Sequence, residues 1–251
     1  MGNRTRHPPP EVERDLKPAI LRSESWAHLR GHVLLFDHQP GPRFDASAGL
    51  RLLITAVVLE AVRLGILKWF YPPVPLLVLI PFFLGAALLG ISLVARVRFS
   101  QLGFRPWREW TLTEKSYFLQ VLVIANVVFP LVFAARLKAI LNQPNALSIV
   151  ATVFVPYLFY GFYQEVVYRG LLQSELVRRW GALPGIVVAN VLYTFGPLHW
   201  NHFSPLNVPM FASIFAIGLF FGILFHRSGN LWIVAIIYGI GTPTLSPVSD
   251  R

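Results

Sequence analysis

Apolar stretches about twenty residues long recur along this chain from Leu52 onward, and they constrain its fold more than any other feature. A helix needs about 20 mostly apolar residues to cross the hydrocarbon core of a bilayer. Only 14% of the 251 residues are charged, whereas a soluble domain usually carries about 25%. After Lys115 the acidic residues are Glu165, Glu175 and Asp250 alone. The sequence therefore predicts an all-α fold, a polytopic bundle of transmembrane helices.

Six stretches predict spanning helices, and a seventh, residues 52–70, is marginal because it carries charge. In that stretch Glu60 and Arg63 lie three residues apart on one helical face, where they can pair. The alternative for residues 52–70 is a helix that lies in the membrane interface. The other predicted spans are residues 74–97, 117–136, 147–172, 183–198, 208–225 and 231–245. Positive charge alternates between the connecting segments, which favours seven spans with a cytoplasmic N-terminus.

The charge distribution divides the chain into three parts. Residues 1–50 form a polar cytoplasmic extension, residues 51–115 two helices and a basic, Trp-rich interfacial segment at 99–110, and residues 116–251 the transmembrane core. The net charge of +10 comes from short basic clusters between apolar stretches, which indicates contact with anionic lipid rather than with nucleic acid. We therefore expect an integral protein of the plasma or inner membrane, with lipid as a partner.

Ionisable and polar side chains inside predicted spans are the candidates for chemistry, because they are costly in lipid. Glu165 and Arg169 stand four residues apart and can form an ion pair, which would fix helix packing or support a site. His199 follows the fifth span, where it would be wetted by a loop, orient a water molecule or stabilise an oxyanion. Tyr238 and Thr242 share a face of the last helix, and their hydroxyls would donate hydrogen bonds or simply pack.

Other catalytic classes lack their residues in this sequence. The chain has no cysteine, which excludes a thiol nucleophile and disulfides. His199 and His202 have HxxH spacing, but no third metal ligand accompanies them, so we expect no metal and no cofactor. No Asp lies in a predicted span, and neither HExxH nor GxSxG occurs. These absences argue against aspartyl, metallo- and rhomboid-type intramembrane proteases.

The three late segments, in this order, resemble the CAAX-protease and bacteriocin-processing family (CPBP, also called Abi). Its motifs are EExxxR, FxxxH and a final HxxxN type, and the resemblance extends over about residues 99–245. Glu165 and Arg169 match the second Glu and the Arg of the first motif, and Phe195 and His199 match the second motif. The resemblance implies an intramembrane endopeptidase in which a glutamate deprotonates water and histidines orient it or stabilise the oxyanion. The implied substrate is a peptide or a protein's C-terminal tail near the membrane.

Two departures from the family pattern concern the chemistry itself. Gln164 stands where the family has its first Glu, held to be the base, and an amide does not accept that proton at neutral pH. Tyr238 and Thr242 stand where the last His and Asn would be. Either Glu165 takes over as base, or the protein is a lapsed relative that binds or regulates a membrane partner. A small-solute transporter is a further alternative.

The predicted site therefore contains the following residues: Glu165, His199, Arg169, Gln164 and Tyr238 in catalytic positions, with Phe195 and Thr242 in support. The predicted topology puts Glu165 in the inner half of its helix and His199 at the outer end of the next one. The two can meet only if the fifth helix is tilted, kinked or re-entrant. The Gly196-Pro197 pair just before His199 provides a break at which the chain can turn.

Overall fold

The structure is a computed structural model that describes residues 46–71, 73–110, 114–116, 118–120, 122–123, 127, 131, 134–199 and 204–245. All of these residues lie in one unit, Phe36–Arg251. Most of the predicted N-terminal extension and much of the predicted third span therefore lie outside the described residues. Within the described ranges every regular element is helical, which confirms the all-α fold class.

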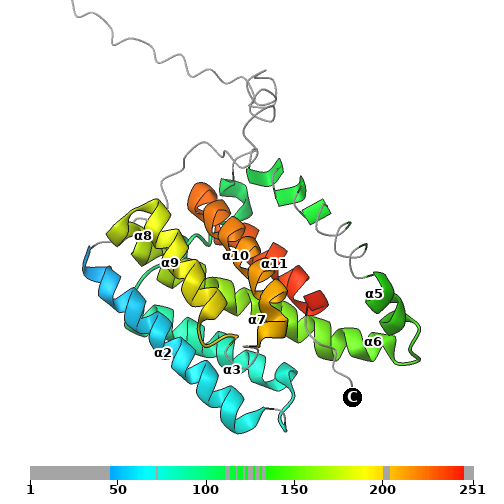
Figure 1. The fold of residues 1–251 in the computed structure, drawn as a ribbon. Helices are drawn as coiled ribbons and strands as arrows, with labels where there is room; N and C mark the ends of the chain where they lie inside the picture. The colour runs from blue at the N-terminus through cyan, green and yellow to red at the C-terminus, as the bar shows by residue number, and fades with distance from the viewer. Residues whose placement is uncertain are drawn as a thin grey trace, which may run out of the picture. The chain divides into compact units, whose positions relative to one another are not determined.

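Figure 1 shows the arrangement of the helices in the described part of the chain. In chain order they are α2 (Ala46–Phe70), α3 (Leu76–Leu89), η2 (Gly90–Ala95), η3 (Phe99–Leu102), η4 (Trp107–Glu109), α5 (Ala134–Leu141), α6 (Ala146–Ile149), η5 (Val150–Phe154), α7 (Val155–Glu165), η6 (Val166–Gln173), α8 (Ser174–Trp180), α9 (Ala182–Phe195), η8 (Pro205–Asn207), α10 (Val208–Ser228) and α11 (Leu231–Leu245). The elements η2, η5 and η6 are π-helical continuations of their neighbours.

A continuous helix from α6 to α8 occupies the centre of this packing. Its middle part, α7 and η6, packs against α2, α3, α9, α10 and α11. Residues of α7 and η6 are accordingly among the most buried in the protein. The polar groups of η6 and of the last turn of α7 are enclosed by neighbouring helices.

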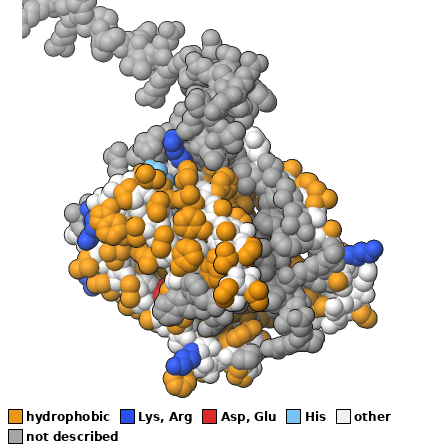
Figure 2. Space-filling view, viewed as in Figure 1, with side chains coloured by type: hydrophobic (Ala, Val, Ile, Leu, Met, Phe, Trp, Pro, Cys, Tyr) orange, Lys and Arg blue, Asp and Glu red, His pale blue; other side chains and the backbone are white. Residues whose placement is uncertain are grey.

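Two described helices are long and apolar enough to cross a membrane, namely Leu76–Ala95 and Pro205–Ser228. Helices also occupy the other predicted spans that the structure describes, although α9, at 14 residues, is shorter than a full crossing. The count of seven spans therefore stays a prediction. Figure 2 shows a face covered by hydrophobic side chains, with Lys and Arg at its edges, as a lipid-facing surface requires.

The predicted interfacial segment 99–110 forms two short 3₁₀ helices, η3 and η4, that are tied to the turn between α10 and α11. Gly103, with φ +94°, accepts a hydrogen bond from the Leu231 amide at 3.0 Å. Arg105 donates to the Ser228 carbonyl at 2.7 Å and pairs with Glu114. A Cβ at Gly103 would lie 2.9 Å from the Leu231 nitrogen, so only glycine fits this contact. Residues 99–110 are thus part of the folded core around α11.

Candidate active site

The helix formed by α7 and η6 carries two polar faces. Residues four apart share a helical face, and two such series occur side by side: Tyr160, Gln164 and Tyr168 form the α2-side face, and Glu165, Arg169 and Gln173 form the α10-side face. The helix widens to π geometry directly after Glu165. Short π-helical segments inside α-helices are frequent at functional sites.

On the α10-side face the predicted Glu165–Arg169 pair is present and fully enclosed. Both side chains are 0% exposed, and Arg169 Nε lies 3.6 Å from Glu165 Oε2. Arg169 Nη2 donates to the Gly218 carbonyl at 2.9 Å, and one turn later Gln173 Nε2 donates to the Gly222 carbonyl at 2.8 Å. These two matching hydrogen bonds fix η6 against α10.

The glycines of α10 are required by this close approach. A Cβ at Gly218 would lie 2.2 Å from Asn190 Oδ1 and 3.3 Å from Arg169 Nη2. At Gly222 a Cβ would lie 3.0 Å from Gln173 Oε1. Asn190, from α9, donates to the Phe215 carbonyl at 2.9 Å, so a third helix joins the same contact. Small residues four apart let helices approach closely in membranes, and here the space admits the polar side chains of η6.

Tyr193 of α9 is the residue that joins the separate parts of the site. Its ring lies 4.9 Å from the Arg169 guanidinium carbon, in cation–π geometry. Its hydroxyl donates to the hydroxyl of Tyr238 on α11. Its carbonyl lies 3.1 Å from His199 Nδ1. Tyr193 is 1% exposed, so these contacts meet in the interior of the bundle.

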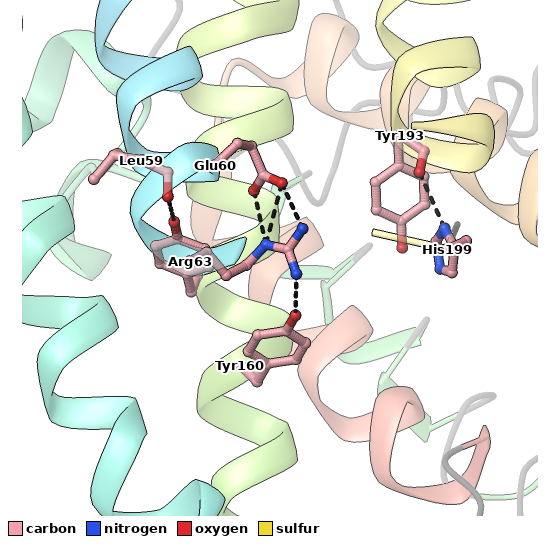
Figure 3. A network of polar contacts seen from close by, with 7 residues as sticks. Leu59, Glu60, Arg63, Tyr160, Tyr193 and His199 are labelled. Carbon is pink, nitrogen blue, oxygen red and sulfur yellow. Dashed lines mark hydrogen bonds and ion pairs between the residues drawn. The ribbon is translucent and has the colours of Figure 1, made fainter. Parts of the chain in front are cut away.

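His199 reaches this place because the chain turns back after α9. The helix ends at Phe195, and the His199 amide donates to the Gly196 carbonyl at 3.1 Å. A Cβ at Gly196 would lie 2.0 Å from the Leu192 carbonyl oxygen, so the turn needs glycine. The ring of His199 comes to 5.7 Å from that of Tyr193 (Figure 3). The turn after α9 therefore brings His199 beside Tyr193, and a direct approach of His199 to Glu165 stays a prediction.

On the α2-side face the charged groups come from another helix. The predicted Glu60–Arg63 pair is present: Arg63 Nη2 lies 2.7 Å from Glu60 Oε2, and Arg63 Nε donates to both carboxylate oxygens at 3.1 and 3.2 Å. Arg63 Nη1 also donates to the Tyr160 hydroxyl at 3.0 Å (Figure 3). The Tyr163 hydroxyl donates to the Leu59 carbonyl at 2.9 Å, which fixes α2 against α7.

Gln164, at the position of the family's first glutamate, belongs to this α2-side face and not to the Arg169 side. It is 4% exposed and its side chain interacts with the Tyr160 hydroxyl. Its Oε1 atom is buried without a hydrogen-bond partner among the described atoms. The side chains of Gln164 and Glu165 thus lie on different faces of the helix and contact different neighbours, as side chains of successive helix residues do.

Several buried polar atoms around Glu165 and Arg169 lack a hydrogen-bond partner in the described part of the chain. They are Glu165 Oε1 and Oε2, Arg169 Nε and Nη1, Gln173 Oε1, Asn190 Oδ1 and Thr194 Oγ1. Most buried polar groups in folded proteins are hydrogen-bonded. A concentration of polar atoms without a hydrogen-bond partner therefore indicates a functional site rather than a packing contact alone.

The remaining predicted site residues have different outcomes. Phe195 stacks on Phe211 at 5.8 Å between ring centroids and lies 42% exposed, outside the polar interior. The backbone at Thr242 is helical, but its side chain lies outside the described residues, as does His202 of the HxxH spacing. The catalytic roles assigned to Glu165, His199, Arg169, Gln164 and Tyr238 stay predictions.

Sequence reasoning missed several residues that the structure places in this site. Gln173 continues the four-residue spacing of Glu165 and Arg169, and Gly218 and Gly222 form a small-xxx-small pattern, so both signals were present. Asn190 is a polar residue in an apolar stretch. Tyr193 gave no signal of its own, because its importance comes from contacts with two other helices and with the turn after α9.

The fold and site define an all-helical protein with a polar site, containing a buried Glu–Arg pair and a histidine, enclosed among apolar helices. Residues 146–241 match the model of a family described as type II CAAX prenyl endopeptidase Rce1-like. The match confirms the recognised family resemblance and includes the Glu165, His199 and Tyr238 segments; it covers less than half of the chain. The family is one of peptidases, and together with the apolar helices it indicates a membrane protein. No curated protein and no solved structure matches this chain.

Proposed function

We propose that this protein is a membrane-embedded endopeptidase of the CAAX-processing type, which cleaves a peptide or the C-terminal tail of a protein near the membrane. The observation that carries the proposal is the convergence of Arg169, Tyr238 and His199 on Tyr193, inside the segment that matches the family. These groups come from η6, α11 and the turn after α9, which are far apart in sequence.

The chemistry of the proposed reaction needs two kinds of group. A carboxylate accepts the proton of the attacking water, and hydrogen-bond donors stabilise the carbonyl oxygen as it becomes negative. The Glu165–Arg169 pair holds η6 in place, and Tyr238 and His199 stand where the family's orienting groups would be. Because a carbonyl only accepts, the contact of His199 Nδ1 with the Tyr193 carbonyl puts the proton on Nδ1. In the neutral ring Nε2 is then the accepting nitrogen, which suits a residue that orients water.

A cleavage assay tests this proposal. The purified protein in detergent would be incubated with fluorogenic tail peptides, one set prenylated and one set not, alongside Glu165→Ala and His199→Ala. General acid–base and oxyanion groups contribute about 10²–10⁴-fold, so we expect a loss of that order in His199→Ala. Glu165→Ala should also lose activity, because it leaves the buried Arg169 unpaired. Leu183→Ala, at a 75% exposed position of α9, is the control that should keep full activity. Cleavage unaffected by both site substitutions would contradict the assignment.

A protease-like protein that binds a membrane peptide without cleaving it is the second candidate. Gln164 and Tyr238 favour it, because they replace the family's carboxylate and imidazole. In that case the wild type would bind tail peptides without turnover, and Gln164→Glu would create cleavage. An active wild type that loses activity on Gln164→Glu would instead identify an enzyme adapted to glutamine.

A further inference from the structure

We propose that Glu60, on α2 and outside the family-matched segment, supplies the carboxylate that Gln164 lacks, and that it accepts the proton of the hydrolytic water. This inference rests on the proposed function and assigns its base. It also gives a role to the charged pair on α2, which the motifs of the family do not include.

The position of Glu60 follows from the two tyrosines that flank Gln164. Tyr160 lies one turn before Gln164 and Tyr168 one turn after it, on the same face of the helix. Arg63 donates to the Tyr160 hydroxyl at 3.0 Å, and the Tyr168 hydroxyl interacts with the Glu60 carboxylate. The ion pair of α2 therefore contacts the tyrosines one turn before and one turn after Gln164, on the same face of the helix as its amide.

Accessibility favours Glu60 over Glu165 as the base. The Glu60 side chain is 13% exposed, whereas Glu165 is 0% exposed and lies beside Arg169 behind α10. A base has to be within hydrogen-bond reach of the proton that it takes. Of these two carboxylates only Glu60 has an accessible surface in the structure.

Two tyrosine rings that contact each other connect the two polar faces, so Glu60 is not remote from the rest of the site. The ring of Tyr168 packs edge-on against that of Tyr193, with 5.3 Å between centroids. Tyr193 in turn contacts Arg169, Tyr238 and His199. Glu60, Tyr168, Tyr193 and His199 thus form one series of contacts across the interior of the bundle, from α2 to the turn after α9.

The proposed step balances with water as the only co-reactant. The water oxygen bonds to the scissile carbonyl carbon while its proton passes to the Glu60 carboxylate. The carbon–nitrogen bond then breaks, and the leaving nitrogen takes that proton from the Glu60 carboxyl group. The carboxylate is regenerated, and the products are a new carboxyl terminus and a new amine. Arg63 balances the charge of Glu60 and holds it in a single orientation by three of the contacts described above.

The test transfers the carboxylate from position 60 to position 164 and measures whether cleavage activity is restored. Cleavage would be measured for the full-length wild type, for Glu60→Gln, and for the double variant Glu60→Gln/Gln164→Glu. We expect Glu60→Gln to lose at least about 100-fold in kcat and the double variant to regain at least about tenfold over it. Failure of the double variant to recover overturns the inference.

The other outcomes separate this inference from the proposed function. Cleavage by the wild type that persists within threefold in Glu60→Gln overturns the role of Glu60 and leaves the endopeptidase in place. A wild type without cleavage overturns both, and cleavage by Gln164→Glu alone would then identify a lapsed site. If Glu60→Gln does not fold, Glu60→Asp decides, since it keeps the charge beside Arg63 but withdraws the carboxylate. We expect Glu60→Asp to lower kcat about tenfold with KM unchanged, and an unchanged kcat overturns the inference.

Discussion

The two polar faces of the α7–η6 helix differ in the origin of their charges. On the α10-side face both partners, Glu165 and Arg169, belong to the helix itself, and both are 0% exposed. On the α2-side face the helix contributes only tyrosines and Gln164, and the ion pair Glu60–Arg63 comes from α2. The first face depends on the helix keeping its register, and the second depends on two helices packing correctly.

This difference predicts which face contributes more to stability and which contributes more to cleavage. A buried ion pair costs desolvation energy that its attraction barely repays, but loss of one partner leaves an uncompensated charge. The enclosed α10-side pair should therefore dominate stability. The α2-side pair is partly accessible, so its loss should affect cleavage more than folding. Three measurements test that contrast, and a fourth concerns the charged end of the same helix.

Removing the arginine of each face should produce the largest difference. Arg169→Ala leaves the Glu165 carboxylate unpaired at 0% exposure, which should cost about 3–5 kcal/mol of unfolding free energy. Arg63→Ala leaves Glu60, which is 13% exposed, and should cost less. Thermal unfolding in one detergent, followed by tryptophan fluorescence, compares them. An equal or larger loss in Arg63→Ala would contradict the contrast.

Filling the space in α10 should have the next largest effect. Gly218→Ala places a Cβ 2.2 Å from Asn190 Oδ1, so α9 or η6 has to move, at a cost of about 1–3 kcal/mol. Gly85→Ala in α3 is the matched control, because no atom of the described residues outside its own helix backbone lies within 4 Å of its Cβ. Removing a helical glycine there should stabilise by about 0.5–1 kcal/mol. If Gly218→Ala raised the unfolding temperature as Gly85→Ala does, the contact of α10 with α9 and η6 would be less tight than described.

Removing the Tyr193 hydroxyl tests the link between the faces. Tyr193→Phe keeps the ring beside Arg169 but loses the hydrogen bond to Tyr238. We expect a stability loss of only about 0.5–1.5 kcal/mol, with a clear fall in kcat. The exposed Tyr71→Phe should change neither quantity. Wild-type kcat in Tyr193→Phe would mean that the Tyr193–Tyr238 contact only packs α9 against α11.

The smallest effect concerns the charged end of the same helix, in α8. Burial raises the pKa of Glu175, but the hydrogen bonds and charges of Arg178 and Arg179 outweigh burial and hold that pKa below its ordinary value. The interaction therefore contributes stability above the unfolded-state pKa of about 4.3, and this contribution is lost as the pH falls through the lower folded-state pKa. Unfolding temperature between pH 5 and pH 3 should fall less steeply in Glu175→Gln than in the wild type. Identical slopes would show that Glu175 titrates alike in the folded and unfolded states.

The parts of the site that sequence predicted correctly are those set by spacing along one helix. Glu60 with Arg63 and Glu165 with Arg169 are three and four residues apart, and helix geometry alone brings such pairs together. The position of Gln164 beside Tyr160 rather than beside Arg169 also follows from helix geometry, but spacing does not say which neighbouring helix each face meets. The matched bonds of Arg169 and Gln173 to α10 depend on that choice.

Sequence by itself determined that this chain is helical and apolar, where its charged pairs lie, and which family its late segments resemble. Tertiary structure alone decided that the Glu60–Arg63 pair of α2 contacts the tyrosines on either side of Gln164, that Tyr193 joins three helices, and that the turn after α9 brings His199 beside Tyr193. The physical reason is that local hydrogen bonding and hydropathy act over a few residues, whereas these contacts join residues up to about a hundred positions apart. They form only when side-chain shape and the close approach allowed by Gly196 and Gly218 select one packing of the helices.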